Sequence, residues 1–451
     1  MLQENPSQSG QDDLFRSELV HWINLSHPLV KLSKLVDWDG LEADFKPFYC
    51  LDNGRPGGSI RLMAGLILLK EIKGISDEEL CATWAENPYF QFFCGETYFQ
   101  HTPPVEPPSI GNFRRRIGEQ GMERLLAETI RVGLLSGTVK DKDLTCVVVD
   151  TTVQEKAIAY PTDTKLCEAA RQALVEKAKE NGIVLRQTYE RSAKKAVFMA
   201  RRYRHARQHN RAKKMDKQVH NFLGRVARDI GRKISADKAL MAIFAEDLAK
   251  AQRIFDQTFN PKTKNKIYSW HAPEVECIGK GKAHKKYEFG CKVSFASTNE
   301  SNFIIGAQAL HGNPFDGHTL GRVLEQIQKL TGIYPKEVAV DRGYRGHGLD
   351  TNKIKILMPG QKRGLTKLLR KRLKRRNAIE PIIGHCKNDR KIGPRNWLKG
   401  KIGDKINAIA MAIGFNLRKI LRTLFLYLLK IIEFMRIWCS IPRIQTQILV
   451  F

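Results

Sequence analysis

Apolar residues at helical spacing dominate the first third of the chain. The segment RLMAGLILLKEIKG, residues 61–74, has one apolar side and ends on glycine, a common helix terminator. Ser76 is followed three residues later by Glu79, a capping-box pattern that predicts the start of the next helix. Ser109 opens a further predicted helix, SIGNFRRRIGEQG. We therefore expect an all-helical N-terminal domain over residues 1–140.

The pattern changes near Leu144, where strand signals begin. TCVVVD, which closes on Asp150, is a β-branched run typical of a buried strand. Further strands are predicted for YEFGCKVSFAS, SNFIIGAQAL, KEVAVD and IKILMP, with the helix GHTLGRVLEQIQKLTG after the third strand and a last helix near Glu380. The order of three strands, a helix, two strands and a helix predicts an α/β domain over residues 141–420. A basic, helical insertion at about 153–285 interrupts it after the first strand.

The last segment, residues 421–451, has an apolar face but carries too many charges for a typical membrane span. Its apolar positions recur at helical spacing: Leu424, Phe425, Leu428, Leu429 and Ile432. Four charged residues interrupt the stretch: Arg422, Lys430, Glu433 and Arg436. We expect a C-terminal helix and tail that pack on the core or on a partner helix.

Three acidic residues stand where a two-metal site needs them. Asp150 and Asp341 each follow a predicted strand, and the carboxyl ends of strands in an open α/β sheet meet at one crevice. Glu380 precedes Pro381, which suits the first turn of a helix, and Lys387 shares its helix face. Arg376 joins them if the preceding basic segment is helical too. The three acids favour bound Mg²⁺, whereas ordinary turn and cap roles are the alternative for each acid alone.

The order DTT, DRGYRG and then R-x3-E-x6-K resembles the DDE transposases of bacterial insertion sequences, in the insertion-sequence-four and -five group. The resemblance extends through KYEFGCKVSF, HGNPFDGHTL and LKGKIGDKINAIAMAIGFNLRKIL, and covers about residues 20–421. Leu373 departs from it, because the family carries a Tyr three residues before the Arg. The resemblance implies an RNase H-like catalytic core in which Asp150, Asp341 and Glu380 hold two Mg²⁺ ions, with Mn²⁺ as a substitute.

Composition agrees with a polyanionic partner. The chain has 76 Lys and Arg against 47 acids, a net charge of +29 over 451 residues. An anionic membrane surface is the alternative polyanionic partner to nucleic acid. The nine cysteines include no CxxC pair, which indicates reduced thiols rather than a zinc site, and MLQENPSQSGQDDLF lacks the apolar segment of a signal peptide. We expect a cytoplasmic, nucleoid-associated bacterial protein with no membrane partner.

Several basic residues are candidates for DNA contact. Arg376 and Lys387 would bind phosphates beside the scissile one, and Arg342 and Tyr344 lie next to Asp341. In the front domain the candidates are Arg114, Arg115 and Arg116. Basic runs occur at Arg191–Lys214 and Lys362–Arg376, where a solvated helix face is the alternative to a phosphate clamp. Phe198 and Tyr203, inside the first run, either stack on an unpaired base or pack within the protein.

The sequence thus predicts a transposase that binds the ends of an insertion sequence and cleaves and joins double-stranded DNA. The expected partners are the transposon ends and the target DNA, and we expect a homodimer in the synaptic complex. A DNA-binding regulator without activity and a nuclease that cuts without joining are the alternatives.

Overall fold

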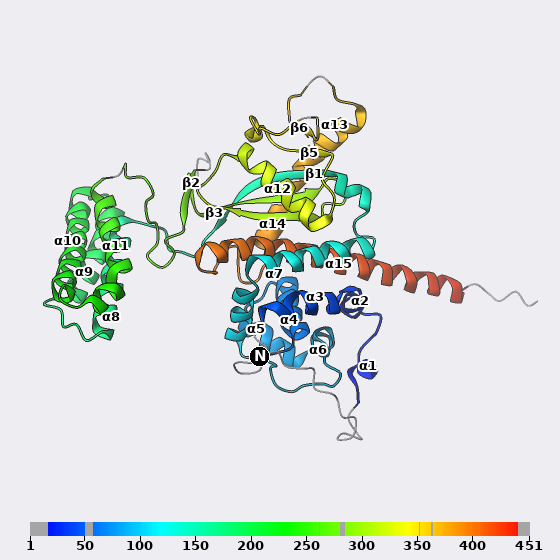
Figure 1. Ribbon diagram of the computed structural model, residues 1–451, viewed down its shortest axis with the longest axis horizontal. Helices are drawn as coiled ribbons and strands as arrows, with labels where there is room; N and C mark the ends of the chain where they lie inside the picture. Colours follow the sequence, from blue (N-terminus) through cyan, green and yellow to red (C-terminus); the bar gives the residue numbers. More distant parts are fainter. Residues whose placement is uncertain are drawn as a thin grey trace, which may run out of the picture. The chain divides into compact units, whose positions relative to one another are not determined.

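The computed structural model describes residues 17–49, 57–260, 262–279, 285–350, 352–361 and 364–440, with side chains described up to residue 427. The chain divides into two compact units (Figure 1). Unit 1 contains residues up to 154, then 292–398 and 402 onwards. Unit 2 contains residues 155–291 and 399–401. The insertion predicted at about 153–285 therefore corresponds closely to unit 2.

The front of unit 1 is helical, as predicted. Its helices are α1 (Leu19–Trp22), α2 (Pro28–Leu35), α3 (Trp38–Phe45), η1 (Lys46–Phe48), α4 (Ile60–Lys73), α5 (Asp77–Glu86), α6 (Pro88–Cys94), α7 (Pro107–Leu135) and η2 (Asp141–Thr145). Helix α4 is buried on nearly every side, so its apolar surface is broader than the single apolar side expected from the sequence. It ends at Gly74, whose φ of 64° is left-handed, and Ser76 caps α5 by accepting a hydrogen bond from the Glu79 amide at 3.1 Å.

Helix α7 is longer than the sequence indicated. It begins at Pro107 rather than Ser109 and continues to Leu135 through a kink at Gly118, where φ is 58° and ψ is −152°. A residue with a side chain would be strained in that conformation, so glycine permits the kink.

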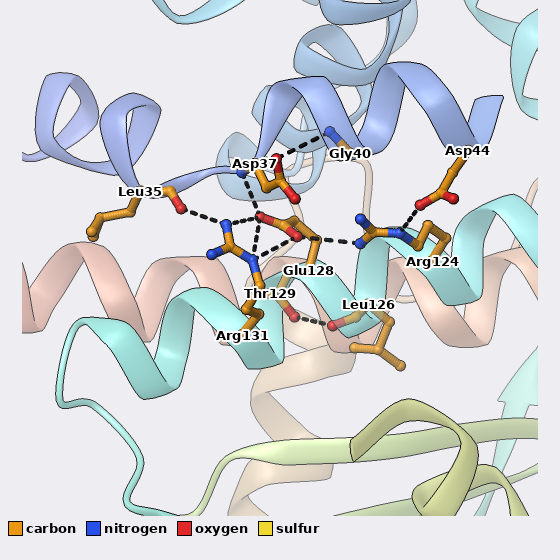
Figure 2. Close-up of polar contacts among 9 residues, drawn as sticks. All are labelled: Leu35, Asp37, Gly40, Asp44, Arg124, Leu126, Glu128, Thr129 and Arg131. Carbon is orange, nitrogen blue, oxygen red and sulfur yellow. Dashed lines mark hydrogen bonds and ion pairs between the residues drawn. The ribbon is translucent and has the colours of Figure 1, made fainter. Parts of the chain in front are cut away.

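A buried carboxylate on α7 holds the turn between α2 and α3 (Figure 2). Glu128 is 1% exposed and accepts a hydrogen bond from the Asp37 amide at 2.8 Å. Arg131 donates to Glu128 at 2.6 Å and to the Leu35 carbonyl at 2.7 Å, while Arg124 donates to Glu128 at 3.2 Å. The buried charge is thus compensated by two arginines and one amide, an arrangement we call the Glu128 network.

The sheet is mixed and has β1 (Cys146–Glu155) near its centre. The other strands are β2 (Glu276–Gly279), β3 (Tyr287–Thr298), β4 (Ile304–Leu310), β5 (Glu337–Ala339) and β6 (Lys355–Leu357). The order is β2-β3-β1-β5-β6, and β4 also pairs with β3. Strands β1, β5 and β6 are parallel, whereas β3 is antiparallel to β2 and to β4. The predicted strands are all present, and β2 is an additional one.

The remaining helices of unit 1 follow the predicted order. They are α12 (Asp316–Thr331), η3 (Arg342–Tyr344), α13 (Lys367–Lys374), η4 (Arg375–Ala378), α14 (Ile379–Asn388) and α15 (Gly400–Ser440). Helix α15 continues without interruption past residue 421, where the sequence suggested a boundary. In the described part of the chain, no helix combines the length and the apolar character needed to cross a bilayer.

The front helices and the sheet share one hydrophobic core. Leu66 of α4, Val148 of β1 and Ile409 of α15 all belong to it. Asn416 of α15 links both parts, because its amide donates to Thr129 of α7 at 3.1 Å and to the Ile304 carbonyl of β4 at 2.8 Å. The predicted boundary near residue 140 therefore does not separate two cores.

Unit 2 is built around four helices, α8 (Asp163–Glu180), α9 (Glu190–His205), α10 (His209–Ile234) and α11 (Lys238–Phe259) (Figure 1). Its own core includes Leu174, Leu223, Phe244 and Ile254, all fully buried. This unit therefore has the apolar interior of an independent bundle.

Candidate functional site

Asp150 lies within strand β1 rather than at its end. The strand continues to Glu155, so the prediction of a strand end was wrong. The parallel pairing of β1 with β5, however, stops at Val148 and Ala339. Asp150 and Asp341 both stand two residues beyond that paired segment, and each carboxylate follows the same stretch of parallel sheet.

The electrostatics of Asp150 show that the predicted acids gather around it. Burial raises the pKa of Asp150 to about 6, although a hydrogen bond from the Thr151 amide, 2.8 Å long, opposes that shift. The negative charges of Asp341 and Glu380 raise this pKa further, and the positive charge of Arg376 lowers it. Such coupling requires the charges to be near one another. The fold thus brings together the three acids and one of the predicted cations.

Local structure fixes the other two acids in different ways. Asp341 caps η3 by accepting a hydrogen bond from the Gly343 amide at 2.8 Å. A Cβ atom at Gly343 would lie 3.0 Å from the Asp341 carboxylate, so glycine leaves room for that carboxylate. Glu380 is exposed in the first turn of α14, which contains Pro381 as expected. The preceding segment is also helical, over α13 and η4, and this continuity carries Arg376 to the site.

A fourth carboxylate, Asp316, reaches the same place. Its Oδ1 atom accepts hydrogen bonds from the Thr151 hydroxyl at 2.9 Å and from Lys292 Nζ at 3.1 Å. Asp316 stands in the first turn of α12. Only the fold shows that its side chain turns to β1 and β3, because no local pattern carries that information.

Tyr344 lies beneath the acids and not on the surface. It is fully buried, and burial raises the pKa of its phenol, as do the charges of Asp150, Asp316 and Asp341. A DNA contact by this side chain is therefore not available in this structure. Arg342, by contrast, is exposed and donates from Nε to the Pro359 carbonyl at 3.3 Å.

Lys387 is hydrogen-bonded to β1, the strand that carries Asp150. Its Nζ atom donates to the Thr152 hydroxyl and to the Val153 carbonyl, both at 2.7 Å. It therefore fixes β1 against α14. Arg376 is partly exposed and donates to the Asn377 side chain at 2.9 Å.

The three front arginines do not form one surface. Arg114 is 6% exposed and donates to Asp77 at 2.8 Å, so it belongs to the interior. Arg115 and Arg116 are exposed, and the Arg116 guanidinium lies 4.9 Å from the centre of the Tyr49 ring. A DNA contact by Arg115 or Arg116 remains a prediction, whereas Arg114 is engaged in an ion pair with Asp77.

Comparisons with known proteins identify two similarities. A transposase domain, DUF772, matches residues 17–116. The chain is also similar to uncharacterized protein ORF8 in the nfe locus of Rhizobium meliloti, with 48% identity over 208 residues. That alignment covers 46% of this chain and 100% of the Rhizobium meliloti protein. No solved structure matches the chain.

Proposed function

We propose that this chain, which belongs to the same family as the Rhizobium meliloti protein and carries a bacterial transposase domain, is a DDE transposase. In this proposal it binds the ends of an insertion sequence, cuts DNA there and joins the freed strand to target DNA. Asp150, Asp341 and Glu380 carry the reaction. The single observation behind this assignment is that Asp341 and Glu380 lie near enough to Asp150 for their charges to raise its pKa.

The acids fit a divalent cation. Asp150 is partly buried beside two other negative charges, and its burial together with those charges raises its pKa to about 6 in spite of Arg376. Carboxylate oxygens are the donors that Mg²⁺ prefers. Asp150, Asp341 and Glu380 would hold Mg²⁺, two ions in this proposal, with Mn²⁺ as a substitute. When bound, the metal activates the attacking oxygen and stabilises the leaving one.

The surrounding residues position the acids and receive the substrate. Lys387 holds β1 through Thr152 and Val153, and this contact keeps the Asp150 segment in place. Asp316 holds Thr151, whose amide in turn donates to Asp150. Arg376 supplies a positive charge beside the acids, suited to a phosphate that flanks the scissile one.

The strand order supports an RNase H-like core. Along the chain, β1, β3 and β4 are followed by α12, then by β5 and β6, and finally by α14. In the sheet, β1 separates the antiparallel strands from the parallel ones. This element order is the one that the sequence resemblance implies for the catalytic core.

Single neutral substitutions test the proposal. Asp150→Asn, Asp341→Asn and Glu380→Gln should each abolish Mg²⁺-dependent cleavage of a labelled duplex that carries the insertion-sequence end. DNA binding should remain, because the basic residues are unchanged. Asp350→Asn, which alters an exposed acid on a loop, is the control and should cleave normally. Cleavage that persists in any of the three variants removes that residue from the site.

A second assay separates joining from cutting. A pre-cut end with a free 3′-OH should be transferred to a plasmid by the unmodified protein in Mg²⁺. Cleavage without transfer would identify a nuclease that only cuts, and binding without either reaction would identify a regulator. The proposed homodimer can be measured in the same samples by the mass of the protein–DNA complex.

A further inference from the structure

Helix α9 in unit 2 presents an unusually basic outer surface. Its buried residues are three alanines, Ala193, Ala196 and Ala200, which pack within the bundle. The rest of its circumference faces solvent or is only partly covered. Its one acid, Glu190, forms an ion pair with Lys194 at 2.8 Å. The packing of α9 is thus achieved mainly by small side chains, and most of its long side chains are exposed to solvent.

An aromatic ring stands in the middle of this surface. Phe198 is 59% exposed, so the structure excludes the core-packing role that the sequence left open. Residues three and four positions away are neighbours on a helix surface. For Phe198 these neighbours are Lys194, Lys195, Arg201 and Arg202, all exposed. We call Phe198 and these four cations the α9 face.

The α9 face continues towards α10. The Arg202 guanidinium lies 5.7 Å from the centre of the Phe198 ring. At the start of α10, Arg211, Lys213 and Lys214 are also exposed. Tyr203 differs from Phe198, because it is partly buried and has Arg211 at 5.9 Å from its ring. Phe198 is therefore the aromatic residue of this basic run that is most available to a ligand.

The residues of the α9 face indicate which kind of ligand it binds. Cations around a ring match a ligand that alternates phosphates with flat bases, as a single nucleic-acid strand does. Paired bases inside a duplex offer no open face to the ring. An anionic membrane would match the charge, but a membrane-bound helix buries a broad apolar face. Apart from Phe198, the apolar residues of α9 are buried or partly covered within the bundle, so the helix offers no broad apolar face.

We propose that the α9 face binds single-stranded or locally unpaired DNA, with Phe198 stacked on a base and the surrounding cations on the adjacent phosphates. This inference deepens the proposed function and rests on it for the identity of the strand, since cutting and joining create strand ends that can unpair. It gives unit 2 a role separate from that of the acids in unit 1.

The test uses the full-length protein in EDTA with a fluorescent oligothymidylate as probe. Phe198→Ala should weaken binding roughly tenfold, the effect of losing one stacked base, without changing the salt dependence. Phe198→Trp should restore binding. Lys195→Gln with Arg201→Gln should instead lower the slope of log K against log salt by about 1.4, which corresponds to two lost single-strand phosphate contacts.

A matched variant controls for net charge. Lys179→Gln with Lys238→Gln removes two exposed lysines from α8 and α11 and should leave both the affinity and the slope unchanged. The proposal is overturned if Phe198→Ala binds the oligothymidylate as the unmodified protein does, or if it weakens duplex binding equally. It is also overturned if the Lys195 and Arg201 changes affect only binding to phosphatidylserine vesicles.

The failure of this inference can be told apart from the failure of the proposed function. If Asp150→Asn abolishes cleavage while Phe198→Ala has no effect on binding, the acids keep their role and the α9 face loses its own. If Asp150→Asn still cleaves while Phe198→Ala loses single-strand binding, the α9 face stands and the assignment of the acids fails.

Discussion

Replacing Asp150 with Asn should stabilise the metal-free protein even though it removes the proposed activity. The pKa of Asp150 is raised from 3.8 to about 6, first by burial and then by the charges of Asp341 and Glu380. At about 1.36 kcal/mol per pKa unit, the ionised carboxylate costs up to roughly 3 kcal/mol above pH 6. Asparagine carries no charge, but it still buries a polar amide, so we expect a gain of about 1–3 kcal/mol.

The pH dependence has a defined sign. Because folding raises the pKa of Asp150, the folded protein holds its proton over a range in which the unfolded chain has lost it. The free-energy cost of the ionised Asp150 carboxylate is therefore absent below about pH 4. It grows between pH 4 and pH 6 and is complete above pH 6. The advantage of Asp150→Asn should follow the same course.

Asp77→Asn is a control with the opposite sign. Burial raises the pKa of Asp77, but the charges of Arg114 and Lys70 outweigh burial, and the net shift is downward. Asp77 pairs with Lys70 at 2.5 Å and with Arg114 at 2.8 Å. The stability it contributes is present at neutral pH and is lost as the pH falls through its lowered pKa. Removing its charge leaves two buried cations uncompensated, which should cost roughly 3 kcal/mol.

Both variants report on unit 1 and can be compared in one assay. We would measure thermal unfolding by tryptophan fluorescence in EDTA at pH 8 and pH 4, and again at pH 8 with Mg²⁺. At pH 8 in EDTA, Asp150→Asn should melt several degrees higher than the unmodified protein, at roughly 2 °C per kcal/mol. Mg²⁺ should reduce that difference. An unchanged or lower midpoint at pH 8, or an equal gain at pH 4, would refute the reasoning.

Three other substitutions test the fold and the support of the site. Glu128→Ala should destabilise unit 1 by roughly 1–3 kcal/mol in urea unfolding and Glu128→Gln by less, because the partly exposed Arg124 and Arg131 and the Asp37 amide lose their shared hydrogen-bond acceptor. Gly414→Ala would place a Cβ atom 2.6 Å from the Glu71 carbonyl and should lower the melting temperature, whereas Gly111→Ala, with its nearest neighbour at 3.8 Å, should not. Lys387→Met removes both hydrogen bonds from Lys387 to β1. It should reduce the cleavage rate at least about tenfold and leave the Kd for DNA unchanged. A normal cleavage rate would contradict the positioning role of Lys387.

The sequence predicted best those features that depend on local chemistry. Gly74 ends α4 in a left-handed conformation, and Ser76 caps α5, because each needs only its neighbours along the chain. Pro381 stands in the first turn of α14 for the same reason. The mixed α/β character and the helical front region are confirmed. The short strand β2 was missed, since four residues are too few to establish a periodic pattern.

Features that depend on distant partners could not be predicted. Strand β1 continues past Asp150 because β3 remains beside it after the pairing with β5 has ended, and the polar residues TTVQE give no sign of that pairing. The sequence around Arg114 predicts a basic surface. In the structure, however, an ion pair with Asp77 keeps the Arg114 side chain in the interior. Asp316 lies 166 positions after Asp150 in sequence, and only the fold reveals that Thr151 links the two.

The insertion of unit 2 between β1 and β3 has a consequence for synthesis of the protein. Asp150 leaves the ribosome long before Glu380, with a delay of roughly 10–45 s at a bacterial rate of 5–20 residues per second. The helical bundle, whose core comes from one continuous stretch of chain, can fold during that delay. The acids can assemble only after α14 emerges, and α15 completes the shared core last. A nascent chain therefore cannot possess the assembled acid site until α14 has been synthesised.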